Sequence, residues 1–129
     1  MEFTVLVINK DKNNPLMIEN NQLIEAYLGM SGHEYVVIES VNEVTSEQYR
    51  QWDCVLAHVP AKELKTLEKL SLENPTTGLV LTTGGGVGEE HQKVTLINSS
   101  KWHFLPKPFT MRTFNDAIKR VVLEAKTSV

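Results

Sequence analysis

Five short apolar runs, separated by longer polar segments, constrain the fold of this chain more than any other feature of its sequence. The first run, residues 3–8, is continuous and rich in β-branched residues, as expected for a strand buried on both faces. The other runs are residues 35–38, 53–57, 78–83 and 102–105. Strands that alternate with helical segments predict parallel β/α units, whose right-handed crossovers place helices on both faces of one sheet.

The segment after the first run carries clear helix signals. Asn14 and Pro15 mark a helix start, and Ser31 and Gly32 mark its end after Met30. Apolar residues recur between these signals at roughly helical spacing, which predicts an inward-facing stripe. The members of this stripe are Leu16, Leu23, Ile24, Tyr27 and Leu28.

Four further helical segments are expected. Thr45 and Gln48 form a weak capping signature for a short helix over residues 45–51, and Pro60 opens a longer helix. Residues 89–98 have moderate helical character, and Thr110 caps a last helix. The apolar stripes of the third and last helices are Leu64, Leu67 and Leu70, and Phe114, Ala117, Ile118, Val121 and Val122.

Composition sets the class of protein. A chain of 129 residues with 41% hydrophobic residues has enough apolar side chains for one domain, spanning residues 1–129. Its net charge of −3 and its lack of a Lys/Arg run argue against direct nucleic-acid binding, and no apolar stretch reaches membrane-spanning length. No signal-peptide pattern follows Met1, and the single Cys54 lies in an apolar run, as a small core residue would. We therefore expect a soluble, cytoplasmic domain without a disulfide.

In a parallel sheet, ligands bind and reactions take place at the carboxyl ends of the strands. Four segments follow predicted strands here: residues 9–11, 58–60, 83–88 and 106–108. These segments are the candidates for a functional site.

Residues at these strand ends fall in a characteristic order. A Thr, Thr83, follows the fourth strand, an aromatic residue, Phe104, lies in the fifth, and a Lys-Pro step, Lys107-Pro108, closes it. In this order and spacing the chain resembles the receiver domain of two-component response regulators, from residue 3 to about residue 125. The resemblance implies a flavodoxin-like (βα)5 three-layer fold with a five-stranded parallel sheet in the order 2-1-3-4-5. It also implies that Thr83 and Lys107 lie where receivers contact the phosphoryl group, and that Phe104 is the switch aromatic.

This sequence departs from the receiver pattern at the positions that bind Mg²⁺ and accept phosphate in receivers. Receivers bind Mg²⁺ with an acidic pair after the first strand and accept phosphate on an aspartate at the end of the third. Asn9 and Lys10 stand at the acidic-pair positions, Asp11 follows one place late, and His58 stands at the acceptor position. Mg²⁺ prefers carboxylate oxygens, and phosphoryl transfer needs a cation to offset its charge. We therefore expect a pseudo-receiver without Mg²⁺-dependent phosphorylation, enzymatic activity, metal or cofactor.

Each altered residue also has a plainer interpretation. Lys10, together with Lys107, would replace the metal's charge and hold the pocket permanently switched, or its amine would simply reach solvent. No activating carboxylate is evident beside His58, which favours a hydrogen-bonded packing residue over a nucleophile. Asp11 is the nearest counter-charge for Lys107. Asp53 lies at the start of its strand, far from the carboxyl edge, and is expected to be a structural polar residue.

The glycine-rich segment Gly84–Gly88 allows two interpretations. Backbone amides of such loops can cradle phosphates before a helix. This one lacks both the dinucleotide and the P-loop patterns, and Glu89 and Glu90 after it would repel an anion. A connecting loop is the favoured interpretation.

A partner surface is expected around the fifth strand. In receivers, the face made by the fourth helix, fifth strand and fifth helix binds other proteins, and Lys101, Trp102 and His103 would contribute to it here. An exposed aromatic residue there would suit a binding hot spot. We expect a signalling protein or another domain of the same regulator as partner, and a homodimer is compatible with the same face.

Three other functions stay open at this point. The chain would be an atypical but phosphorylatable receiver if Asp11 or His58 served in an unaligned way. It would be an anion- or nucleotide-binding module if the lysines and Gly84–Gly88 held a phosphate. A small flavin domain is the weakest alternative, because residues 9–15 lack the expected Ser/Thr-Gly loop.

Overall fold

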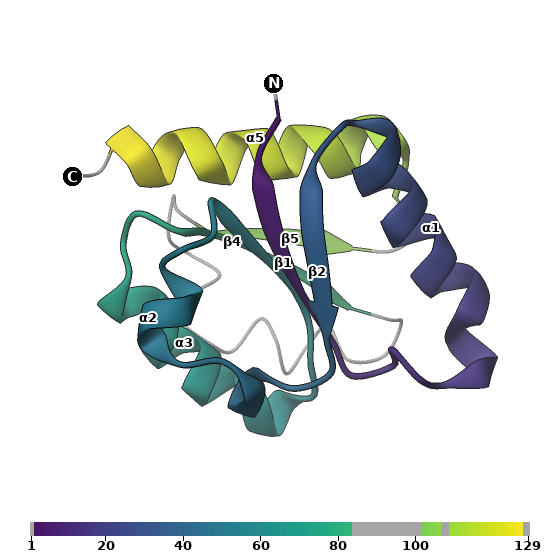
Figure 1. The fold of residues 1–129 in the computed structure, drawn as a ribbon, viewed down its shortest axis with the longest axis horizontal. Helices are drawn as coiled ribbons and strands as arrows, with labels where there is room; N and C mark the ends of the chain where they lie inside the picture. The colour runs from purple at the N-terminus through teal and green to yellow at the C-terminus, as the bar shows by residue number, and fades with distance from the viewer. Residues whose placement is uncertain (1, 84–101, 107–108, 128–129) are drawn as a thin grey trace.

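The computed structural model describes residues 2–83, 102–106 and 109–127, and its centre is one parallel sheet (Figure 1). The five strands lie in the order β2-β1-β3-β4-β5, which confirms the predicted flavodoxin-like topology. Their bounds are Thr4–Asn9 for β1, Glu34–Ile38 for β2, Cys54–His58 for β3, Gly78–Thr83 for β4 and Trp102–Pro106 for β5.

The strands differ from the predicted runs mainly at their ends. β1 begins and ends one residue later than predicted, and so does β3. Asp53 falls just outside β3, where its backbone N–H donates to the Thr4 carbonyl at 3.1 Å. Every residue of β3 is buried, as expected for the central strand of a sheet that is covered on both faces.

Helices cover both faces of the sheet and make three layers (Figure 1). α1 (Ile18–Met30) and α5 (Met111–Thr127) pack on one face, where Ile24, Leu28 and Phe114 belong to one core cluster. α2 (Ser46–Tyr49) and α3 (Leu64–Glu73) pack on the other face in a second cluster. A short 3-10 helix precedes each of α1, α2 and α3: η1 (Pro15–Met17), η2 (Val41–Glu43) and η3 (Ala61–Glu63).

Several local signals act as predicted. The Asn14 side chain accepts from Leu16 N at the start of η1, and Gly32 takes a φ of 77° after α1. Thr45 and Gln48 form the predicted capping box around α2. The predicted stripes of α3 and α5 are buried: Leu64, Leu67 and Leu70, and Phe114, Ala117, Ile118, Val121 and Val122.

The first helix differs from its prediction. The segment starts with the 3-10 turn η1, and α1 begins only at Ile18. A 3-10 turn has three residues per turn instead of 3.6, so it changes the phase of the faces that follow. Leu16 lies in this turn and is 90% exposed. Leu23 lies in α1 beside Ile24 but is also exposed, so only Ile24 and Leu28 of the predicted stripe are buried.

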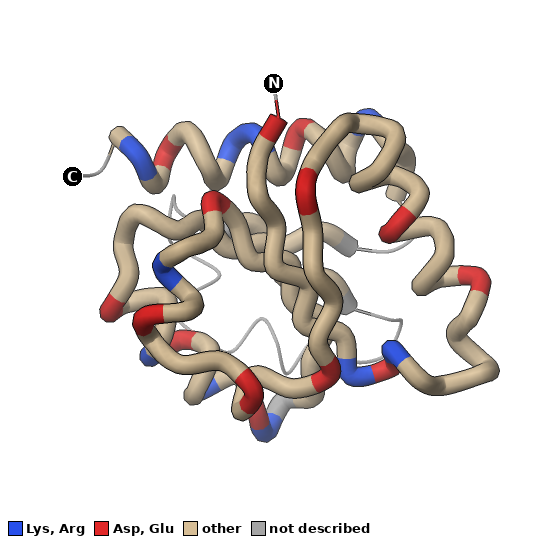
Figure 2. The backbone as a smooth tube through the Cα atoms, in the orientation of Figure 1, with Lys and Arg blue, Asp and Glu red and all other residues tan. Residues whose placement is uncertain are grey.

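Charge is dispersed over the surface. Figure 2 shows acidic and basic positions interspersed along α5, whereas the charged positions of α1 are acidic. Within the described ranges, no helix combines the length and the apolar composition that crossing a membrane requires.

Candidate functional site

The carboxyl ends of β1 and β3 lie side by side. Parallel pairing places Asn9 opposite His58, and the Lys10 N–H donates to the His58 carbonyl at 3.0 Å. The chain then turns back, with Lys12 N donating to the Asn9 carbonyl and Asn14 N to the Asp11 carbonyl, both at 3.0 Å. This turn brings Asp11 over the end of β3.

His58 is buried at this edge, where two described residues contact its ring nitrogens. Its Nε2 lies 2.8 Å from Asp11 Oδ2, and its Nδ1 lies 3.4 Å from the Thr82 carbonyl oxygen at the end of β4. The two side chains of the pair are 8% and 17% exposed for His58 and Asp11. The sequence showed no carboxylate beside His58, and this expectation was wrong because Asp11 lies 47 residues away and is delivered by the turn after β1.

A second set of hydrogen bonds ties the turn to α1. Asn9 donates through Nδ2 to Asn21 Oδ1 at 2.7 Å and accepts from Asp11 N at 2.9 Å. Asn21 donates through Nδ2 to the Asp11 carbonyl at 2.7 Å. Asn21 was not among the predicted site residues. It precedes the buried Ile24 and Leu28 by three and seven positions, and a polar residue on a buried helical face was the available signal.

The Asp11 carboxylate is held in its ionised form. Burial alone would raise its pKa, but hydrogen bonds from His58 and Asn14 and the charges of His58 and Lys10 outweigh burial and lower the pKa below 3.8. Both carboxylate oxygens have partners, since Oδ1 also lies 3.4 Å from Asn14 Nδ2. This carboxylate is therefore already coordinated by protein groups.

Lys10 lines a different hollow beside the same edge. This hollow, of about 350 Å³, is also lined by Glu39, Glu43 and Glu63. Two of these glutamates cap backbone groups: Glu43 accepts from the N–H groups of residues 39 and 40, and Glu63 accepts from Val41 N at 3.0 Å. Among the described residues, no three His, Cys, Asp or Glu side chains are grouped as they would be around a metal ion.

Comparison with known proteins identifies the architecture. No protein-family model and no curated protein matches the sequence. A response regulator receiver domain protein from Clostridium thermocellum superposes with a TM-score of 0.74 over 98% of both chains, at 18% sequence identity. A CheY-like receiver domain protein from Methanospirillum hungatei gives 0.68 over 100% of both chains at 16% identity. The BeF3-activated receiver domain of nitrogen regulatory protein C gives 0.69 at 18% identity, covering 95% of this chain and 96% of that one.

The chain has the fold of response-regulator receiver domains. Because the sequence identities are only 16% and 18%, these comparisons show the fold alone. Within the receiver fold, Asn9, Lys10 and His58 lie at the carboxyl edge of the sheet, as their positions in the sequence implied.

The structure describes the other predicted site residues unevenly. Phe104 in β5 is partly buried and packs against the cluster under α2 and α3. Thr83 ends β4, and its backbone is paired with Pro106 of β5. Gly84–Gly88, the predicted helix over residues 89–98, Lys101 and Lys107 lie outside the described residues, and Trp102 is described only through its backbone in β5.

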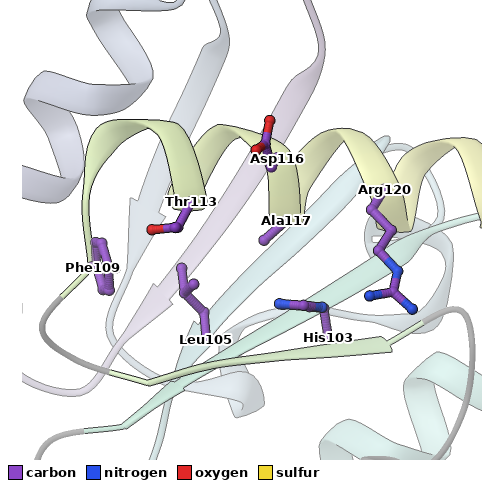
Figure 3. Close-up of a pocket in the computed structure, with 7 residues that line it drawn as sticks. All are labelled: His103, Leu105, Phe109, Thr113, Asp116, Ala117 and Arg120. Carbon is purple, nitrogen blue, oxygen red and sulfur yellow. The ribbon is translucent and has the colours of Figure 1, made fainter.

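His103 lines a hollow between β5 and α5 (Figure 3). The hollow measures about 420 Å³, with Leu105, Phe109 and Ala117 among its apolar walls. Figure 3 shows Arg120 extending from α5 toward β5 at the end where His103 lies, and Phe109 at the other end. Burial and the Arg120 charge lower the pKa of His103, against the opposing effect of Glu124, which favours the neutral imidazole.

Two residues outside the edge have structural roles, as predicted. The Asp53 carboxylate accepts from Thr4 N at 3.0 Å and pairs with Lys126 Nζ at 3.0 Å, joining β1, β3 and α5. Cys54 is fully buried, and burial raises the pKa of its thiol, which makes it an unreactive core residue.

Proposed function

We propose that this chain is a pseudo-receiver: a regulatory module that binds a protein partner in intracellular signalling without being phosphorylated and without catalysing a reaction. The observation that carries the proposal is the His58–Asp11 contact of 2.8 Å at the place where receivers carry their phosphoacceptor. The edge that would hold Mg²⁺ and a phosphoryl group is instead closed by an internal hydrogen-bonded pair.

The chemistry of the edge supports a phosphorylation-independent role. A Mg²⁺ site normally uses one or two carboxylates, and here Asn9 and Lys10 supply an amide and an ammonium. Asp11 would have to leave His58 and Asn14 before it could bind a cation. Attack by a His58 nitrogen would likewise cost the contact with Asp11 or with the Thr82 carbonyl.

The β5–α5 hollow supports protein binding on the expected face. Its volume of about 420 Å³ accommodates large side chains, and its apolar walls are flanked by the charges of Asp116 and Arg120. An apolar centre with a polar rim is the usual anatomy of a protein interface. Of the predicted partner residues, His103 lines this hollow.

The test is a two-dimensional amide NMR titration with Mg²⁺ and then beryllofluoride, with the receiver domain of nitrogen regulatory protein C as the positive control. The proposal expects no saturable shifts at Asp11, His58 or Thr82. Saturable shifts that spread to Phe104 would overturn it in favour of an atypical, phosphorylatable receiver.

A gain-of-function variant provides the matched comparison. Restoring carboxylates with Asn9→Asp, Lys10→Asp and His58→Asp should create Mg²⁺-dependent shifts at the same amides, provided the circular dichroism spectrum stays that of the folded protein. A thermal-shift panel of nucleotides covers the remaining alternative, because any ligand that binds the folded state stabilises it. Nucleotide-dependent stabilisation would replace the present proposal with an anion-binding role.

A further inference from the structure

The His58 imidazole lies between two groups that can only accept hydrogen bonds. Nε2 faces the Asp11 carboxylate at 2.8 Å, and Nδ1 faces the Thr82 carbonyl at 3.4 Å. A neutral imidazole carries one N–H, and only the imidazolium donates through both nitrogens. Both contacts are therefore hydrogen bonds only when His58 is protonated.

We infer that His58 is a proton-operated latch that fastens the turn after β1 to the end of β4. This inference rests on the proposed function, because it names what regulates the edge in place of phosphorylation. With two protons on the ring, the latch joins Asp11 to Thr82 through His58. With one proton, the shorter contact to an ionised carboxylate keeps Nε2–H, and the Nδ1 lone pair then faces the Thr82 carbonyl lone pairs. Loss of the proton therefore opens the Thr82 side.

The surroundings of His58 make its protonation strongly affect the contacts of its ring. The pair is mostly buried, so its charges interact in a medium less polarisable than water. Asp11 favours the imidazolium, while the charge of Lys10, which also acts on Asp11, opposes a second positive charge nearby. Lys107, which the receiver resemblance places at the same edge, lies outside the described residues and is therefore tested directly by a variant.

The backbone of the β4 end is paired with β5, and the latch adds a side-chain contact to it. Thr82 Oγ1 is buried and has no hydrogen-bond partner among the described residues, so within that part of the chain the His58 ring makes the side-chain contact with Thr82. The Thr82 position pairs with Leu105 of β5, and Leu105 lines the β5–α5 hollow. A shift of the β4 end is thus passed along the sheet to the proposed partner face.

The test is ¹⁵N NMR of the His58 ring, together with the Thr82 and Leu105 amides, between pH 5 and pH 9. We expect both ring nitrogens to be protonated at the acidic end, Nδ1 to lose its proton as the pH rises, and both amides to shift with the same midpoint. Asp11→Asn should move that midpoint down by about one pH unit or more, since an opposite charge at this range is worth about 1–3 units. His58→Gln should remove the amide transition, and His33→Gln, at a histidine remote from this edge, should leave it unchanged.

Three outcomes would overturn the latch. One is an Nδ1 that is unprotonated at every pH from 5 to 9. Another is a Thr82 transition that persists in folded His58→Gln protein. The third is a midpoint that responds to Lys107→Gln as strongly as to Asp11→Asn. The beryllofluoride titration is independent of these results, so a latch that fails and a pseudo-receiver that fails give different patterns.

Discussion

Gly78 marks a very close approach of α5 to the sheet, and we expect one added methyl group there to be costly. A Cβ atom at residue 78 would lie 2.7 Å from the backbone carbonyl carbon and oxygen of Val121 and 2.8 Å from its Cγ2. Ordinary contact begins at 3.4 Å. The helix would therefore have to retreat by about 0.7 Å, and the backbone it would move cannot rotate away as a side chain can.

The cost follows from what α5 buries. A gap of about 0.5–1 Å forfeits about a quarter to a half of a dispersion contact. The side chains that would lose contact are Phe114, Ala117, Ile118, Val121, Val122 and Ala125. We expect Gly78→Ala to lower the free energy of unfolding by about 3 kcal/mol, at the upper end of the usual cost of overpacking.

Urea unfolding followed by circular dichroism measures this change. The midpoint of Gly78→Ala should fall by more than about 1 M relative to the parent protein. Gly29→Ala in α1 is the matched control, because a Cβ at residue 29 meets nothing within 4 Å. That control should gain about 0.5–1 kcal/mol from helix propensity. A Gly78→Ala protein within about 0.5 kcal/mol of the parent would refute the reasoning.

Three further predictions concern local interactions. Burial lowers the pKa of His33, whose Nδ1 accepts from Phe3 N at 3.0 Å. As the pH falls, the His33 imidazole therefore becomes protonated in the unfolded chain before it does in the folded one. The free energy of unfolding should decrease as the pH drops through 6.5, and this decrease should be smaller in His33→Gln. Thr110→Ala should cost about 1 kcal/mol in urea unfolding, because Thr110 Oγ1 caps the first turn of α5. Burial raises the pKa of Asp53, but bonds from the β1 backbone and Lys126 outweigh burial and hold the pKa below 3.8. Asp53→Asn should therefore cost about 1–2 kcal/mol at pH 7 and less near pH 3, as measured by thermal unfolding at the two pH values.

For each of these three predictions, one experimental result would contradict the stated cause. An unchanged pH dependence in His33→Gln would show that other groups govern stability near pH 6. Thr110→Ser keeps the hydroxyl and should retain the cap, so equal losses in Thr110→Ser and Thr110→Ala would exclude capping as the cause. A loss in Asp53→Asn that is the same at pH 3 as at pH 7 would mean that the charge of this carboxylate is not involved.

Much of the fold could be predicted from local patterns. The runs of apolar residues place five strands, and the capping residues Asn14, Thr45 and Thr110 act where the sequence puts them. Strands and helix caps depend on residues that are close together in the sequence, so local patterns are enough to predict them. The first helix shows the limit of this reasoning, because the segment starts with a 3-10 turn in which Leu16 is exposed, and Leu23 of α1 is exposed as well.

The candidate site shows which information only the tertiary structure holds. Asn9, Lys10 and His58 could be assigned to one edge because the parallel order of the strands implies it. The partner of His58 could not be assigned, since the path of a turn decides which side chain of residues 9–11 faces β3. Asn21 enters through the packing of α1, and Gly78 is required by the approach of α5.

The sequence by itself determined the five strands, the helical segments that follow β1, β2 and β3, and the residue types at the positions that the receiver resemblance marks, because each is a property of short segments. Only the tertiary structure decided that Asp11 meets His58 and that His58 reaches Thr82. These contacts join one turn and two strand ends that are far apart in the chain, and their geometry follows from how the whole sheet and its helices pack.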